Sequence, residues 1–307
     1  MSKTLAIAAT LAIAASAPAF AGPLRAAAMI ARPAGPVSDN LELTVVNAAT
    51  FTMGAGKAGK TDAAHMVSVS NSFALSTTEI TQGLFEDVMG YNPAESGTKF
   101  WGGNARGACA SFDGVSLVGE DLPVHCVTWT EAIAFANKLS EREGLQAAYK
   151  VDAKGVHWDR SANGYRLPTE AEWELAARGG VAAAAASESD VCAFGNVADA
   201  TARSKWNGWL TGVCDDGVYG LAPVGSYRKD ASGLLDMSGN VMEWVWDAAA
   251  AYGEDAVVNP SADEGLERIA RGGSWSNLPK AAAPTTRTAY DMDTRENFIG
   301  LRLARSL

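Results

Sequence analysis

The sequence of 307 residues predicts one α+β domain with much irregular structure. Alternating apolar residues predict strands near the start, and apolar residues at helical spacing predict three helices before residue 181. After that point, closely spaced Gly, Asn, Asp and Ser predict loops and short strands. Hydrophobic residues make up 48% of the chain and charged residues 20%, which suffices for a sizeable core and excludes general disorder.

The start of the chain predicts export. A cationic end precedes an apolar run over residues 5–15, and an Ala-x-Ala cleavage site ends at Ala21. We therefore expect residues 1–21 to be a signal peptide, residues 22–40 a flexible lead-in and residues 41–307 the domain. The apolar run is shorter than the roughly 20 residues that span a bilayer. We expect a periplasmic or secreted protein, with no membrane insertion after signal cleavage.

Two strands are predicted at the start of the domain. Residues 41–46 read Leu-Glu-Leu-Thr-Val-Val, and residues 66–70 read Met-Val-Ser-Val-Ser. Both runs alternate as a half-buried strand does. We expect the second strand to end near residues 73–75.

Three helices are predicted next. Their apolar positions are Leu84, Phe85, Val88 and Met89 in the first, Ile133, Phe135, Ala136 and Leu139 in the second, and Trp173, Leu175 and Ala176 in the third. Capping boxes over residues 128–131 and 169–172 begin the second and third helices. Gly90 ends the first, and Gly179–Gly180 is expected to end the third. The low-complexity run over residues 181–186 is expected to be an exposed loop.

The charge balance restricts the partners. The chain has 35 acidic and 25 basic residues, a net charge of −10. An acidic surface repels a phosphate backbone, so a nucleic-acid partner is not expected. Glu170 and Glu174 on the third helix are expected to face water or to pair with Arg178.

The four cysteines are expected to form disulfides, because an exported protein meets an oxidising environment. We prefer the local pairs Cys109–Cys126 and Cys192–Cys214, since each would bridge a loop without regular structure. Each closed loop would stabilise the fold by about 3 kcal/mol. A catalytic or metal-binding thiol pair is the alternative, but no CxxC spacing is present and the three histidines are scattered.

Several segments together carry a family resemblance. They lie at residues 79–85, 122–129, 165–178, 222–225, 233–247, 271–275 and 300–304, and they include Asp236-Met-Ser-Gly-Asn-Val-Met-Glu-Trp and Arg271-Gly-Gly-Ser-Trp. In this order they resemble the formylglycine-generating enzyme family, also called sulfatase-modifying factors. The resemblance covers roughly residues 41–305. It implies a variant of the C-type-lectin-like fold with bound calcium.

The family's activity, which the resemblance implies, is oxidation of a sulfatase cysteine to formylglycine with oxygen and copper. The family binds Cu(I) with two thiolates just after the Gly-Gly-Ser motif. The matching positions here are Asn277 and Ala282, and residues 271–307 contain no cysteine. Ser274, which the family places beside the substrate cysteine, is retained, whereas Met242 replaces a tryptophan of the site. Copper is therefore not expected, and we assign no catalytic residue.

The resemblance also implies two calcium sites. The matching residues are Asn196, Val197, Asp216 and Val218 in the first site, and Asp236, Gly239, Val241 and Glu243 in the second. Carboxylates and carbonyls exposed at a glycine turn suit this hard cation. The alternative is that Asp236 and Asn240 only form Asx turns. We expect calcium as the bound ion.

The missing thiols favour a non-catalytic function. The favoured hypothesis is an exported, calcium-stabilised binding or accessory protein whose ligand is a protein, peptide or glycan. The alternative is a divergent oxidoreductase of the family that acts on a secreted peptide, siderophore or protein. True formylglycine generation has only the fold in its favour, and a surface display protein would also suit this fold.

Overall fold

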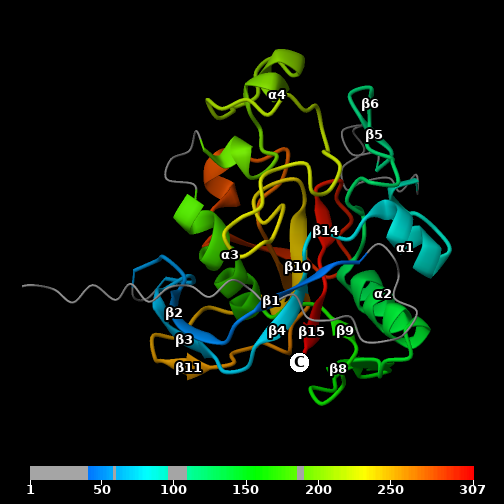
Figure 1. Ribbon diagram of the computed structural model, residues 1–307, viewed down its shortest axis with the longest axis vertical. Coiled ribbons are helices and arrows are strands. Elements are labelled where there is room, and N and C mark those ends of the chain that lie inside the picture. The colour runs from blue at the N-terminus through cyan, green and yellow to red at the C-terminus, as the bar shows by residue number, and fades with distance from the viewer. Residues whose placement is uncertain (1–40, 58–59, 96–108, 185–189) are drawn as a thin grey trace, which may run out of the picture.

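The fold is taken from a computed structural model that describes residues 41–57, 60–95, 109–184 and 190–307 (Figure 1). The predicted signal peptide and lead-in lie outside the described residues. Among the helices of the described ranges, none combines the length and the apolar character that a membrane crossing requires. The described chain mixes helices with several small sheets, as the α+β prediction requires.

One four-stranded sheet joins the two ends of the domain. It has the order β1-β4-β15-β9, all antiparallel, with β1 at Leu43–Val46, β4 at Phe73–Ser76, β15 at Ala304–Ser306 and β9 at Tyr165–Arg166. The predicted first strand is therefore confirmed. The second strand was expected to end near residues 73–75. These residues belong instead to the separate strand β4. β4 pairs with both β1 and β15, which the local pattern did not indicate.

A second four-stranded sheet lies at the centre of the molecule (Figure 1). Its order is β13-β12-β10-β14, with β10 at Met242–Ala248, β12 at Glu267–Arg271, β13 at Arg287–Asp291 and β14 at Ile299–Leu301. Every residue of β10 is buried, and β14 runs parallel to it. Acidic residues at or near β10 are therefore taken out of water, and this burial determines their chemistry.

Three smaller sheets complete the strands. The order β11-β3-β2 combines Val257–Val258, His65–Val69 and Ala49–Met53. The hairpins are β5–β6, at Ser111–Phe112 and Val115–Ser116, and β7–β8, at Tyr149–Asp152 and Gly155–Trp158. β3 confirms the second predicted strand over residues 66–69, but the strand ends at Val69, before the expected residues 73–75.

Four α-helices are present in the described residues: α1 at Gln82–Met89, α2 at Trp129–Arg142, α3 at Glu170–Ala184 and α4 at Ala200–Lys205, with single 3₁₀ turns at Pro93–Glu95, Val191–Ala193 and Pro279–Ala282. Thr128 and Glu131 form the predicted capping box of α2, and Gly90 ends α1 with a left-handed backbone. The predicted end of α3 at Gly179–Gly180 was wrong. The alanine-rich segment that follows has the highest helix propensity, so the helix continues to Ala184.

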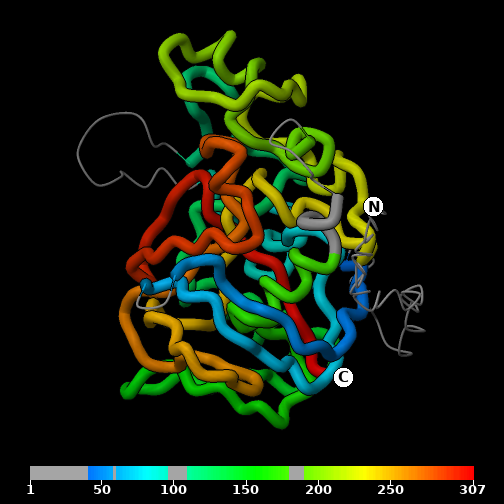
Figure 2. Tube along the Cα trace, turned by 90° about the vertical axis from the view of Figure 1, so that its left-hand side faces the viewer, coloured from blue at the N-terminus to red at the C-terminus, as the bar shows by residue number. Residues whose placement is uncertain are grey.

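Both predicted disulfides are confirmed: Cys109 pairs with Cys126, and Cys192 pairs with Cys214. The second disulfide ties together an arm, residues 190–219, that contains α4. In Figures 1 and 2 this arm stands at one end of the molecule, beyond the central sheet. Trp206 of the arm is buried against Trp275, with ring centroids 5.7 Å apart.

Candidate functional site

A buried ion pair forms the centre of the first acidic cluster. Arg302, between β14 and β15, donates from Nε to Glu243 Oε2 at 2.6 Å and from Nη2 to Glu243 Oε1 at 2.7 Å. Trp173 Nε1 also donates to Glu243 Oε2, at 2.6 Å. Both oxygens of Glu243 are thus occupied by donors from the protein, so this predicted calcium ligand is held in a bidentate ion pair.

A second carboxylate of this cluster, Glu79, was not on the predicted ligand set. It lies before α1 and is 1% exposed. Its two oxygens accept hydrogen bonds from Asn240 Nδ2 at 2.8 Å and from the Val241 backbone N–H at 3.0 Å. Burial, reinforced by the negative charges of Asp236 and Glu243, raises the pKa of Glu79 well above its usual value. The Glu79 segment did carry part of the family resemblance, but nothing local marked its acid as a neighbour of β10.

The third carboxylate, Asp236, has an oxygen with no partner. It is 2% exposed and has a left-handed backbone, with φ 58°. Its Oδ2 accepts from the Gly225 N–H at 2.6 Å, whereas Oδ1 has no hydrogen-bond partner among the described residues. Burial raises the pKa of Asp236 to about 6, and Glu243 adds to the increase. Unpaired buried carboxylate oxygens are costly unless an ion occupies them.

The charges of the cluster do not balance within the protein. Glu79, Asp236 and Glu243 carry three negative charges when ionised, and Arg302, which acts on all of them, carries one positive charge. Two negative charges are left over, which a divalent cation would offset. The unpartnered Oδ1 and the nearby glycine turn at Gly239, with φ 82°, fit a hard, oxygen-coordinated cation.

A second pair of acids, the buried Asp199 and the half-buried Asp216, lies at the base of the arm. Asp199 caps α4, since its Oδ1 accepts from the Ala202 N–H at 2.9 Å, and its Oδ2 accepts from the Asp216 N–H at 2.5 Å. Asp216 Oδ1 accepts from Val218 at 2.8 Å, but Oδ2 has no partner within the described ranges. Burial, with the adjacent charge of Asp199, raises the pKa of Asp216 to about 7.

This pair can hold a metal ion. Oxygens of Asp199 and Asp216 lie within 4.8 Å of each other and of Cys192 Sγ. Cys192 is in a disulfide, so the carboxylates are the ionic donors. Asp216 is one of the residues that the family resemblance indicated, whereas Asp199 is not, and an aspartate that caps a helix carries no separate sign of metal binding.

The loops of the two predicted calcium sites are hydrogen-bonded to each other. The Asn196 carbonyl accepts from the Asn240 N–H at 2.7 Å, and Asn196 Nδ2 donates to Asn240 Oδ1 at 3.2 Å and to the Gly220 carbonyl at 2.7 Å. The backbone N–H of Val197 approaches the Asp216 carboxyl. The fold therefore brings the segments of both predicted sites together, although the Asn196 amide is engaged within the protein.

Ser274 lies in a loop between β12 and the 3₁₀ turn at Pro279–Ala282. Its buried hydroxyl donates to Asn277 Oδ1 at 2.9 Å. Ala282 is buried in a small apolar cluster with Cys192 and Val197. The loop thus offers a hydroxyl, an amide and a methyl group. This donor set does not fit Cu(I), which is bound by convergent soft sulfur ligands.

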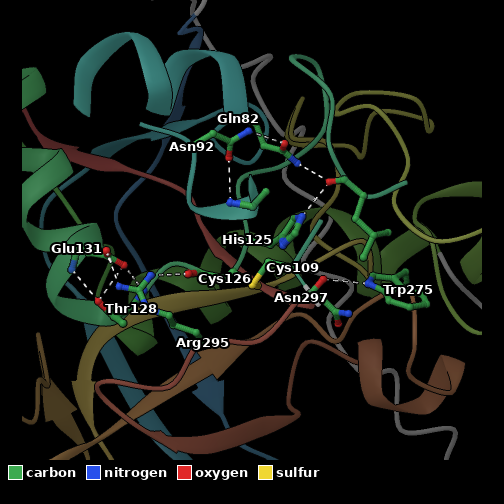
Figure 3. The surroundings of a disulfide bond; sticks show 12 residues. Gln82, Asn92, Cys109, His125, Cys126, Thr128, Glu131, Trp275, Arg295 and Asn297 are labelled. Atoms are coloured by element: carbon green, nitrogen blue, oxygen red, sulfur yellow. Dashed lines mark hydrogen bonds and ion pairs between the residues drawn. A yellow bond between two sulfur atoms is a disulfide. The ribbon is translucent and has the colours of Figure 1, made fainter. Parts of the chain in front are cut away.

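The cysteines of the chain are all paired, which removes them as copper ligands. Figure 3 shows the first disulfide, with His125 beside Cys126. His125 is fully buried, and its Nε2 lies 2.9 Å from the Leu117 carbonyl. Burial lowers the pKa of His125 to about 4. The backbone carbonyl of Cys126 accepts from Arg295 Nη1 at 2.8 Å, so this disulfide is part of a polar network.

Comparisons with known proteins agree with the motif analysis. The family profile described as "Sulfatase-modifying factor enzyme 1-like domain" matches residues 31–307. The chain is 30% identical to a chaperone protein LppX of Paenibacillus barcinonensis, over 82% of this chain and 87% of that protein. It is 36% identical to a formylglycine-generating enzyme of Streptomyces coelicolor over 46% of each chain. It is 30% identical to an inactive C-alpha-formylglycine-generating enzyme 2 of Mus musculus, over 53% of this chain and 52% of the other.

The alignments with the latter two proteins thus span about half of their length. Among solved structures, Treponema denticola variable protein 1 superposes with a TM-score of 0.69 and 26% identity, over 87% of this chain and 95% of that one. The similarity therefore extends over nearly all of the described fold.

Proposed function

This chain belongs to the sulfatase-modifying factor family, and we propose that it is an exported, calcium-stabilised binding or accessory protein that does not generate formylglycine. The observation that carries the proposal is that the protein has no free thiol to bind copper. All four cysteines are paired in disulfides, and residues 271–307 contain none. A Cu(I) centre needs sulfur ligands at the loop of Ser274, where the chain has Asn277 and Ala282.

Two relatives support a non-catalytic role. The relative named as a chaperone aligns over most of both chains, whereas another is named as an inactive member of the family. A chaperone acts by binding a polypeptide, so a protein or peptide is the ligand class we favour over a glycan. The two disulfides support export, because such bonds persist in oxidising compartments.

Calcium is proposed for structural rather than catalytic reasons. Asp236, with Glu79 nearby, would hold one ion, and Asp199 with Asp216 would hold the other. The supporting observations are the unpartnered oxygens Asp236 Oδ1 and Asp216 Oδ2 in surroundings with excess negative charge. An ion at each position would crosslink loops that otherwise have little regular structure.

A peptide oxidation assay tests whether this protein generates formylglycine. The purified protein is incubated with a Cys-x-Pro-x-Arg peptide, oxygen and Cu(I), and the peptide thiol is followed by mass spectrometry. We expect the thiol to persist, while the Streptomyces coelicolor enzyme converts the same peptide in a parallel reaction. Conversion by this protein at a rate that scales with its concentration would refute the proposal.

A further inference from the structure

A cavity of about 170 Å³ lies between β3, the start of α3 and the segment after β10. It shares no lining residue with the two acidic clusters or with the loop of Ser274. Met53, Ala171, Val257 and Pro260 form an apolar wall. The exposed residues 250, 251 and 253 border it, which leaves a route from solvent.

His65 lines this cavity and has one ring nitrogen without a hydrogen-bond partner among the described residues. The residue lies opposite Met53 in the β2–β3 pair and is 7% exposed. Its Nδ1 is 3.0 Å from the Ala63 carbonyl, which only accepts, so Nδ1 carries the proton and Nε2 carries the lone pair of the neutral ring. Nε2 makes no hydrogen bond to any described residue. A lone pair held in this way is ready to accept a donor from a ligand.

Two further residues with side-chain oxygens, Asp247 and Tyr252, line the same cavity. Asp247 is the second-last residue of β10; its Oδ2 accepts from the Glu170 N–H at 2.7 Å, and its Oδ1 accepts from the Ala262 N–H at 2.9 Å. Each carboxylate oxygen can accept a second hydrogen bond. The Tyr252 hydroxyl is buried and has no hydrogen-bond partner in the described chain. Its ring packs against His65, with centroids 5.0 Å apart.

Arg287, a positively charged residue that lines the cavity, already uses most of its N–H donors within the protein. Arg287 donates from Nε and Nη2 to the two oxygens of Glu170, at 2.9 and 2.7 Å. Its Nη1 donates to the carbonyls of Thr61 and Ala250, at 3.0 and 2.7 Å. Among the side-chain groups left for a ligand, the unpartnered nitrogen of the neutral His65 ring and the Asp247 carboxylate only accept, so a ligand with several hydrogen-bond donors suits them.

We propose that this cavity binds a primary ammonium group on a short aliphatic stem. The three N–H donors of the ammonium meet His65 Nε2, the Asp247 carboxylate and the Tyr252 hydroxyl, and the stem packs against the apolar wall. A cavity of about 150 Å³ is known to hold benzene, so a ligand of about five or six heavy atoms fits. A free alkylamine and a lysine side chain share this chemistry. The inference is independent of the proposed function.

The test uses the three histidines as reporters, because only His65 lines the cavity. The disulfide-intact protein is titrated with n-butylammonium chloride, and the histidine ring signals are followed by NMR at constant ionic strength. We expect a saturable shift of the His65 signals and none for the exposed His157. n-Butanol and sodium butyrate serve as the neutral and anionic controls. An equal response to either control, or no saturable response to butylammonium, would overturn the proposal.

A matched pair of variants tests the geometry without disturbing the fold. Tyr252→Phe removes a hydroxyl that has no protein partner but keeps the ring between its neighbours. We expect it to weaken butylammonium binding by about tenfold, as the loss of a hydrogen bond to a charged group does. Tyr219→Phe, on the arm, should leave the affinity unchanged. Equal affinities of Tyr252→Phe and the unmodified protein would contradict the arrangement.

A second titration distinguishes a free alkylamine from a lysine side chain as the source of the ammonium group. Nα-acetyl-lysine N-methylamide replaces butylammonium as the probe. Saturable binding of this compound with competition against butylammonium indicates a lysine side chain as the occupant. Binding of butylammonium alone indicates a free amine, and either result supports the ammonium site.

Discussion

Replacement of Asp236 by asparagine should change stability in opposite directions with and without calcium. In calcium-free protein the carboxylate is buried with an unpartnered Oδ1, and its pKa is raised from the ordinary 3.8 to about 6. A raised folded-state pKa means that stability is fully present below pH 4 and is lost as the pH rises through about 6. Above that pH the ionised group destabilises the fold by about 3 kcal/mol.

Asp236→Asn removes this charge but keeps an oxygen that can accept from Gly225. Loss of the charge-assisted hydrogen bond costs about 1 kcal/mol, which leaves a net stabilisation of about 2 kcal/mol without calcium. In a domain of this size that corresponds to a Tm higher by about 4–8 °C at pH 7.5. With free calcium at about 100 times its Kd, the unmodified protein instead gains about 2.7 kcal/mol from this site, and the variant does not.

The assay is thermal unfolding followed by circular dichroism, with the disulfides intact, in chelator and in millimolar calcium. The exposed Asp255→Asn is the control and should follow the unmodified protein in both buffers. We expect the Tm order of Asp236→Asn and the unmodified protein to reverse when calcium is added, and magnesium not to restore it. A variant that is less stable in both buffers would refute this reasoning, as would an unmodified protein that does not respond to calcium.

Three further predictions concern other parts of the structure. Stability of the chelated protein should fall as the pH rises from about 4 to 7, and Asp216→Asn should flatten this decline in chemical denaturation, because burial raises the pKa of Asp216 to about 7. Glu174→Gln should cost about 3–5 kcal/mol, since it removes the closer of the two carboxylates that pair with buried Arg271 and leaves only Glu170 at 3.4 Å, whereas exposed Glu86→Gln should have no effect; urea unfolding measures both. Thiol titration of the denatured, unreduced protein should find only traces of free thiol, and a stoichiometric amount would contradict the two disulfides.

Much of the secondary structure was predictable because its causes are local. The capping box of Thr128 and Glu131 needs only residues three positions apart, and the structure contains both of its hydrogen bonds. The predicted end of α3 was wrong because two opposing local signals, a glycine pair and an alanine run, meet there, and the alanine run dominates. Glu174 did pair with Arg178 as predicted, but it and Glu170 are buried beside Arg271 rather than exposed to water.

The candidate sites were predictable only in part. Family motifs indicated Asp236 and Asp216, because those residues lie within recognisable segments. Glu79 reaches Asn240 across 161 positions of the chain, and no local pattern reports such a contact. The cavity of His65 and Tyr252 likewise joins residues from β3 and from the segment after β10. A solitary histidine and a tyrosine in a loop carry no signal of their own.

The sequence by itself determined which chemistry the protein can supply. It contains four cysteines that suit disulfides and none at the family's copper positions, and these are facts of composition and order. Only the tertiary structure decided which acids lose their water, which oxygens remain without partners and which are occupied by Arg302. The physical reason is that an acid's charge and pKa depend on burial and on neighbours from distant segments, and folding alone brings those together.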